Sequence, residues 1–224
     1  PKKKHWSRHD IKSTKPLTII QEEMFQEFFA GSNICAHGSA GTGKTYIAVY
    51  LALCELLTPS TDTERIIIVR SVVPTREVGH LPGTLEEKQA VYETPYKDIF
   101  AALLGHQSSY DDMKEAGLVQ FCTTSFVRGL TWDNAIVIVD EFQNMQMDEF
   151  DGVITRAGEG TRMIISGDNV RQCDLKRGEV PAANNIIKVL GSMNSFSTVT
   201  FTVHDIVRSE LVKSWIKARE ALSV

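Results

Sequence analysis

The sequence predicts an α/β domain in which helices cover both faces of a doubly wound, mainly parallel β-sheet. Short apolar runs of strand length alternate along the chain with longer helical patterns. These runs are almost continuously apolar, which is typical of strands that are buried on both faces. The 224 residues suffice for one such domain, or for one domain with an insertion.

Six runs rich in β-branched and other apolar residues are the expected strands. In chain order they span 33–37, 65–69, 118–122, 135–139, 162–166 and 198–203. The helices expected around them span 19–30, 44–57, 95–104, 146–157, 181–190 and 209–221. Residues 71–94 have mixed polarity and contain Pro74, Gly79, Pro82 and Gly83, so they predict a long loop excursion of the kind that often carries function.

The composition limits the classes of function. A net charge of -4 argues against a wholly basic nucleic-acid coat but permits a local basic face. The cysteines lie far apart without paired CxxC spacing, which favours a reducing, cytoplasmic compartment. The most apolar helix pattern, Tyr46 to Leu57, is too short to span a bilayer, so we expect no membrane partner.

Residues 1–15 predict a basic, flexible tail ahead of a domain that spans 16–224. The opening stretch "PKKKHWSRH" is followed by "DIKSTKPLT" rather than by an apolar run, so a secretory signal is not expected. A solvated terminus is the interpretation we favour. A localisation signal and an arm that touches phosphates are the alternatives.

One expected strand leads directly into "GSAGTGKT", which matches the phosphate-binding P-loop at every fixed position. Its glycines let backbone N–H groups form an anion nest, and the helix that begins near Lys44 aims the positive end of its dipole at the same phosphates. Lys44 should reach the β- and γ-phosphates of ATP, and Thr45 should bind Mg²⁺. The alternative is an ordinary glycine-rich turn. The predicted nucleotide-binding residues of this loop are Gly38, Ser39, Ala40, Gly41, Thr42, Gly43, Lys44 and Thr45.

Another expected strand, "AIVIV", ends in Asp140 and Glu141. Burying an unpaired carboxylate costs several kcal/mol, so both acids should meet a cation or water. In a P-loop protein Asp140 would hold Mg²⁺, and Glu141 would be the general base that takes a proton from the attacking water. This second acid favours a hydrolase over a small-molecule kinase. The alternative is a helix N-cap, which does not by itself need the Gln143 and Asn144 that follow.

With these motifs the chain resembles the PhoH family of P-loop ATPases, whose core is similar to that of superfamily 1 helicases. The family's motifs occur in the family's order as "GSAGTGKT", "GHLPGTLEEK", "VRGLTWDNAIVIVDEFQN", "ISGD" and "DIVRSELV". The resemblance implies a single RecA-like P-loop NTPase domain with the core strand order 5-1-4-3-2, in which residues 162–166 lie between the P-loop strand and the strand before Asp140. It also implies a homo-oligomer, commonly a ring of six. Phe142 stands where the family usually has a small residue.

The resemblance also implies roles for residues outside the two motifs. Gln143 would contact the γ-phosphate or its water, Asp168 after the sensor strand would help to bind the nucleotide, and Gln21 would read adenine through its amide. The alternatives are an exposed loop amide for Gln143 and a solvent-facing helix glutamine for Gln21. After Asp168 the chain has one residue more than the family's pattern, so either Gln172 follows a bulge or Arg171 takes its place.

Arg208 is the candidate arginine finger, a cation that stabilises charge on the transferred phosphoryl group. The alternative is a surface salt bridge to Glu210. A one-domain chain has no second lobe from which a finger could reach its own ATP. We therefore predict that Arg208 completes the active site of a neighbouring subunit.

Binding of a nucleic acid would need cations and aromatic side chains that reach backbone and bases. Arg70 and Arg128 could equally be structural arginines bonded to carbonyl groups. The leading hypothesis is a magnesium-dependent ATPase that binds or moves along RNA or single-stranded DNA, and the rival is an ATP-driven protein-binding switch. The candidate nucleic-acid residues are Arg70, Ser71, Arg76, Phe126 and Arg128, together with His5 and Trp6 of the tail.

Overall fold

The computed structural model describes residues 6–71, 85–168 and 182–222. A six-stranded sheet lies at its centre, and every pairing between neighbouring strands is parallel. The strand order is β3-β2-β4-β5-β1-β6. The strands are β1(Asn33–Gly38), β2(Arg65–Arg70), β3(Val119–Thr123), β4(Ala135–Asp140), β5(Arg162–Asp168) and β6(Phe196–Phe201).

The predicted parallel α/β core is confirmed. β5 pairs with both β1 and β4, so residues 162–166 separate the P-loop strand from the strand before Asp140, as predicted. The predicted order 5-1-4-3-2 counts five strands, whereas this sheet has six. The additional strand is β3, which lies at one edge, so the strand numbers differ between the two orders.

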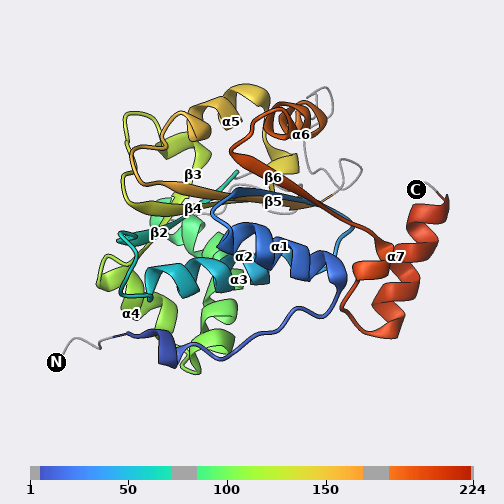
Figure 1. The fold of residues 1–224 in the computed structure, drawn as a ribbon, viewed down its shortest axis with the longest axis horizontal. Coiled ribbons are helices and arrows are strands. Elements are labelled where there is room, and N and C mark those ends of the chain that lie inside the picture. Colours follow the sequence, from blue (N-terminus) through green and yellow to red (C-terminus); the bar gives the residue numbers. More distant parts are fainter. Residues whose placement is uncertain (1–5, 72–84, 169–181, 223–224) are drawn as a thin grey trace.

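Helices cover both faces of the sheet (Figure 1). Successive side chains of a strand point to opposite faces, which divides the apolar residues into two cores. Ile66 and Ile68 of β2 pack on the side of α1 to α4, whereas Ile67 and Val69 pack on the side of α5 and α6. The helices are α1(Ile19–Phe29), α2(Lys44–Leu56), α3(Leu85–Leu104), α4(Ser109–Glu115), α5(Met147–Ile154), α6(Ala183–Gly191) and α7(Glu210–Leu222).

The segment before α1 differs from the predicted flexible tail. Trp6 and Ile11 are buried in the core beneath the sheet, and the Lys12 backbone N–H donates to the Leu103 carbonyl at 2.7 Å. The prediction of a solvated tail is therefore wrong at Trp6 and Ile11, whose apolar side chains anchor an otherwise largely exposed stretch. Residues 1–5, including His5, lie outside the described residues.

The excursion predicted at 71–94 is partly helical. α3 begins at Leu85, ten residues before the predicted helix at 95–104, and Pro95 lies inside it. A proline is best tolerated in the first turn of a helix. The sequence analysis therefore began the helix at Pro95 and missed the turns that precede it. Residues 72–84 lie outside the described residues. No helix in the described ranges has the length and apolar character needed to cross a membrane.

Candidate functional site

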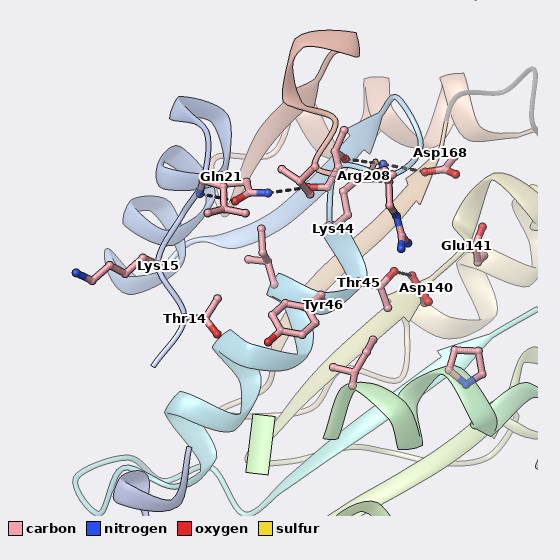
Figure 2. A pocket seen from close by; sticks show the side chains of 18 of the residues that line it. Thr14, Lys15, Gln21, Lys44, Thr45, Tyr46, Asp140, Glu141, Asp168 and Arg208 are labelled. Carbon is pink, nitrogen blue, oxygen red and sulfur yellow. Dashed lines mark hydrogen bonds and ion pairs between the residues drawn. The ribbon is translucent and has the colours of Figure 1, made fainter. Parts of the chain in front are cut away.

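A cavity of about 570 Å³ opens at the carboxyl ends of the central strands, where parallel α/β sheets usually bind their ligands. Its walls come from the loop between β1 and α2, from the ends of β2, β4 and β5, and from the segment between β6 and α7 (Figure 2). Predicted site residues gather there: Gln21, Gly41, Thr42, Gly43, Lys44, Thr45, Asp140, Glu141, Asp168 and Arg208 line the cavity.

Glycines shape the P-loop between β1 and α2. Gly38 has a φ of +126°, and a Cβ atom there would lie 1.9 Å from the Phe201 carbonyl oxygen on neighbouring β6. Gly43 has a φ of +86° and forms the N-cap of α2. Both conformations favour glycine. The loop therefore delivers the first turn of α2, with its unpaired N–H groups, to the cavity.

Lys44 is buried at the start of α2, and its ammonium bonds to neighbouring groups of the same chain. Its Nζ donates to the Ser39 carbonyl at 2.7 Å and to Thr42 Oγ1 at 3.2 Å. It also forms an ion pair of 2.8 Å with Asp168. A phosphate that reaches Lys44 would thus meet an ammonium that already has an anionic partner.

Asp140 is almost completely buried, and hydroxyl groups surround its carboxylate. Oδ1 accepts from Thr45 Oγ1 at 2.9 Å and from Ser166 Oγ at 2.6 Å, and Oδ2 accepts from the Tyr96 hydroxyl at 2.7 Å. Carboxylate and hydroxyl oxygens are the hard ligands that Mg²⁺ prefers, with waters and phosphate oxygens as the remainder. The donor set of Thr45 and Asp140 therefore fits this ion.

Glu141 adopts the left-handed backbone conformation, with a φ of +56°. This is uncommon for a residue other than glycine and occurs often at functional sites. Burial raises the pKa of the Glu141 carboxyl to about 7, and the negative charges of Asp140 and Asp168 add to this effect. The Gln143 hydrogen bond and the charge of Arg70 oppose the rise. A carboxyl with a pKa near neutrality suits proton transfer.

Gln143 links Glu141 to the end of β5. Its Nε2 donates to the Glu141 carboxylate, and its Oε1 accepts from the Asp168 backbone N–H at 2.9 Å. Gln143 is 1% exposed, so the alternative of an exposed loop amide is wrong. Phe142 packs beneath this bridge, and only a glycine fits opposite it: a Cβ atom on Gly167 would lie 2.5 Å from the ring.

Gln21 on α1 is also buried, so the solvent-facing alternative is wrong. Its Oε1 accepts from the Leu17 backbone N–H at 2.7 Å, and its Nε2 donates to the Thr42 carbonyl at 2.9 Å. The amide thereby ties the P-loop to the segment before α1. A primary amide has two donor hydrogens and two acceptor lone pairs, so these two bonds leave hydrogen-bonding capacity for a base.

Arg208 lies at the cavity of its own chain. The residue follows β6, which pairs with β1, and it lines the same cavity as Lys44 of its own chain. Its Cγ would lie 3.0 Å from a Cβ atom on Gly41. The link from β6 to α7 thus brings an arginine to the cavity of its own chain, which the sequence analysis did not expect. Whether Arg208 acts within its own chain or between chains stays a prediction.

The candidate nucleic-acid residues separate into different places. Arg70 lines the nucleotide cavity, and its guanidinium lies 5.8 Å from the centre of the Tyr92 ring. Burial lowers the pKa of Arg70, but the interaction with the Tyr96 hydroxyl, which includes a hydrogen bond, and the negative charges of Asp140 and Glu141 raise it overall. The position of Arg70 thus favours a role at the nucleotide over contact with a nucleic acid.

The other nucleic-acid candidates lie elsewhere. Ser71 is buried at the end of β2, and Trp6 is in the core. Phe126 and Arg128 are exposed after β3, and Arg128 lines a second cavity of about 320 Å³. Arg76, Arg171 and Gln172 lie outside the described residues, so the question of which residue follows Asp168 stays open.

Sequence reasoning missed two partners of Asp140. Tyr96 lies on α3, 44 residues away in the chain, within a stretch that shows no motif. Ser166 belongs to the motif "ISGD", and it ends the run "RMIIS" that was expected beside the strand of Asp140, but the sequence analysis gave it no role. Both donors share one carboxylate with Thr45.

Comparison with known proteins agrees with these motifs. The family model described as PhoH-like protein matches residues 13–220. The chain belongs to the PhoH family. Protein PhoH of Escherichia coli (strain K12) is 33% identical over 214 residues, covering 93% of this chain and 60% of the relative. A PhoH-like protein of Bacillus subtilis (strain 168) is 34% identical over 208 residues, covering 92% and 64%.

The PhoH match does not extend over whole relatives, because this chain spans 60% and 64% of the length of those two proteins. Among solved structures, the Sulfolobus solfataricus SWI2/SNF2 ATPase core in complex with dsDNA aligns with a TM-score of 0.47 and 15% identity. The alignment covers 85% of this chain and 45% of that one. A likeness at this level decides neither a substrate nor a partner for this family member.

Proposed function

We propose that this PhoH family member is a magnesium-dependent ATPase whose turnover is coupled to binding of RNA or single-stranded DNA. One observation carries the ATPase part of the proposal. Lys44 and Thr45 of the P-loop converge in a single cavity with Asp140 and Glu141, the two acids that end the strand β4. This set contains the phosphate cradle, the metal ligands and the general base that hydrolysis requires.

Each of these side chains has a defined task in the proposal. The P-loop amides and Lys44 bind the phosphates, and Thr45 and Asp140 hold Mg²⁺. When bound, the ion neutralises charge on the phosphate oxygens. Glu141 accepts the proton of the attacking water, and Gln143 fixes the orientation of the Glu141 carboxylate through its hydrogen bond.

Arg208 supplies the remaining positive charge. We assign it to the nucleotide of its own chain, because its guanidinium enters the cavity that also contains Lys44 and Thr45 (Figure 2). Assembly into a homo-oligomer, with six subunits as the family resemblance suggests, is a separate proposal. In that case the subunit contacts would not be needed to deliver the arginine.

The nucleic-acid part of the proposal rests on the segment that follows β3. Phe126 is 50% exposed there, and Arg128 is exposed two residues later. An aromatic ring on which a base can stack and a cation for the phosphate backbone are the two elements of single-strand binding. This segment lies at the same carboxyl edge of the sheet as the nucleotide cavity, since β3 is parallel to β2 and β4.

A protein-binding switch is the rival, and an exposed apolar stripe on α7 favours it. Leu211, Trp215 and Leu222 are 80%, 69% and 73% exposed. They are spaced by four and seven residues, so they lie on one side of the helix. Such a stripe beside the nucleotide cavity could bind a partner protein whose release follows ATP turnover.

ATP turnover measured with single-stranded RNA, single-stranded DNA, duplex DNA and no polymer tests the proposal. We expect stimulation by single strands and very little turnover in Glu141→Gln under all conditions. If no polymer changes the rate while a protein partner does, the switch replaces the nucleic-acid coupling. If Glu141→Gln hydrolyses ATP at the wild-type rate, the ATPase assignment of this cavity fails.

A further inference from the structure

Glu149 on α5 joins three segments that are distant in the sequence. Its Oε1 accepts from Thr124 Oγ1 at 2.8 Å and from Ser71 Oγ at 3.4 Å. Its Oε2 accepts from the Gln146 backbone N–H at 2.9 Å. The carboxylate therefore ties the end of β2 and the start of the segment after β3 to the N-terminus of α5.

Two of these connections lead to the nucleotide cavity. Ser71 directly follows Arg70, whose side chain lines the cavity. Gln146 belongs to the short stretch that begins at Glu141, in which the Asn144 N–H donates to the Glu141 carbonyl at 2.9 Å. Arg70 adjoins Ser71, and Glu141 lies five residues before Gln146, so only a few residues separate the cavity from these partners of Glu149.

The third connection leads to the surface. Thr124 begins the one-turn helix η2(Thr124–Phe126), and the exposed side chains of Phe126 and Arg128 follow. Thr124 itself is 8% exposed, and its hydroxyl donates to Glu149 beneath the surface of this segment. The segment Thr124–Arg128 is thus fixed at its base by the acid that also contacts the two stretches from the nucleotide cavity.

We infer that Glu149 is a positioning residue that transmits the state of the nucleotide cavity to the segment Thr124–Arg128. Its Oε1 holds one short and one long hydrogen bond, and hydrogen bonds weaken steeply with distance and angle. A small movement of Ser71 or Gln146 therefore changes the strength of the bond to Thr124. The inference rests on the proposed binding of ATP in the cavity, and the identity of what binds at Phe126 and Arg128 rests on the proposed function as well.

Amide hydrogen exchange of residues 123–130, compared between ADP and a non-hydrolysable ATP analogue with Mg²⁺, tests the inference. We expect the exchange rates of wild type to differ between the two nucleotides. Glu149→Leu should lose this difference, since its side chain accepts no hydrogen bond from Ser71, Thr124 or Gln146. Nucleotide affinity, measured by titration, should stay at the wild-type value in this variant, which shows that the fold is intact.

A matched pair at Thr124 separates signalling from packing. Thr124→Val keeps the shape but removes the donor, and Thr124→Ser keeps the donor with less bulk. We expect Thr124→Val to lose the nucleotide-dependent difference and Thr124→Ser to retain it. The inference is wrong if Glu149→Leu or Thr124→Val keeps the difference seen in wild type, or if wild type shows none.

Turnover with single-stranded RNA distinguishes this inference from the proposed function. If RNA has no effect on wild type while the exchange difference is present and depends on Glu149, the inference stands and the nucleic-acid coupling fails. If RNA stimulates wild type and Glu149→Leu by the same factor, the coupling stands and the role of Glu149 is refuted.

Discussion

Lys44 and Asp168 form an ion pair across the nucleotide cavity, with Nζ 2.8 Å from the carboxylate oxygen. An anionic phosphate must compete with Asp168 for this ammonium. We therefore expect Asp168→Asn to bind ADP more tightly, on the order of tenfold, because a charge-assisted hydrogen bond contributes roughly 1.5–3 kcal/mol and tenfold corresponds to about 1.4 kcal/mol. Calorimetric titration with ADP measures the change.

Asp151→Asn is the control for this prediction. Asp151 is exposed on α5, so its substitution changes the net charge equally without touching Lys44. Its ADP affinity should match that of wild type. Weaker binding by Asp168→Asn would show that Asp168 holds the nucleotide rather than competing with it.

Phe142 should contribute to stability more than to chemistry. Its side chain is fully buried against Gly167. Phe142→Ala should lower the free energy of unfolding by about 3–5 kcal/mol, the usual cost of truncating a buried phenylalanine, and should keep ATP turnover at temperatures where the protein is folded. Phe126→Ala, at a half-exposed ring, should change it by less than about 0.5 kcal/mol. Equal losses in urea denaturation would contradict this account.

Binding and chemistry should separate between Lys44 and Glu141. Lys44→Ala removes a direct phosphate contact and should weaken nucleotide binding. Glu141→Gln keeps an acceptor for the Gln143 amide but cannot take the proton of water, so it should bind ATP normally and hydrolyse it very slowly. Binding by titration and single-turnover hydrolysis measure the two effects. Weak ATP binding by Glu141→Gln would place this residue among the binding groups instead.

The two arginines once grouped as nucleic-acid candidates should now behave differently. Affinity for single-stranded RNA should fall as salt rises, because each phosphate contact releases counterions. Arg128→Ala should reduce the slope of this dependence by about one. Arg70→Ala is the matched comparison, since Arg70 lies in the nucleotide cavity, and it should lower ATP turnover while leaving the slope unchanged. A weaker salt dependence of RNA affinity in Arg70→Ala would show that Arg70 contacts the nucleic acid.

The parts of the site that the sequence revealed are those built from contiguous residues. The P-loop encodes a turn, an anion nest and a helix start within eight positions, and Asp140 with Glu141 follows an uninterrupted apolar strand. Their functions depend on local backbone geometry, which short motifs specify. The order of the central strands followed from the same motifs, because the resemblance identified which strands carry them.

Contacts between distant segments were not readable in this way. The hydroxyl of Tyr96 reaches Asp140 only because α3 packs on the sheet beside α2, and a tyrosine in a helical pattern gives no sign of that neighbour. Trp6 and Ile11 looked like parts of a polar tail because their apolar partners lie on other elements. The position of Arg208 beside its own P-loop was not foreseen for a related reason, because it depends on the pairing of β6 with β1.

Arg208 should act on the nucleotide of its own chain. Arg208→Ala should keep nucleotide affinity but lose turnover by a factor on the order of 10³, as removal of an arginine finger does. Lys213→Ala, which removes a cation from α7 that pairs with Glu210, should turn over normally. Mixing decides between a role within the chain and one between chains. Lys44→Ala subunits keep Arg208, and Arg208→Ala subunits keep the P-loop.

If Arg208 works within its own chain, every subunit of such a mixture lacks one essential group, and turnover should not exceed the average of the two separate variants. Exchange of subunits is checked with two fluorescent labels, and the specific activity of wild type should be independent of protein concentration. Recovery of turnover on mixing would show instead that a good P-loop meets a good arginine only at an interface between chains. In that case Arg208 would act on the nucleotide of a neighbouring subunit, although it lines the cavity of its own chain in the structure of the single chain.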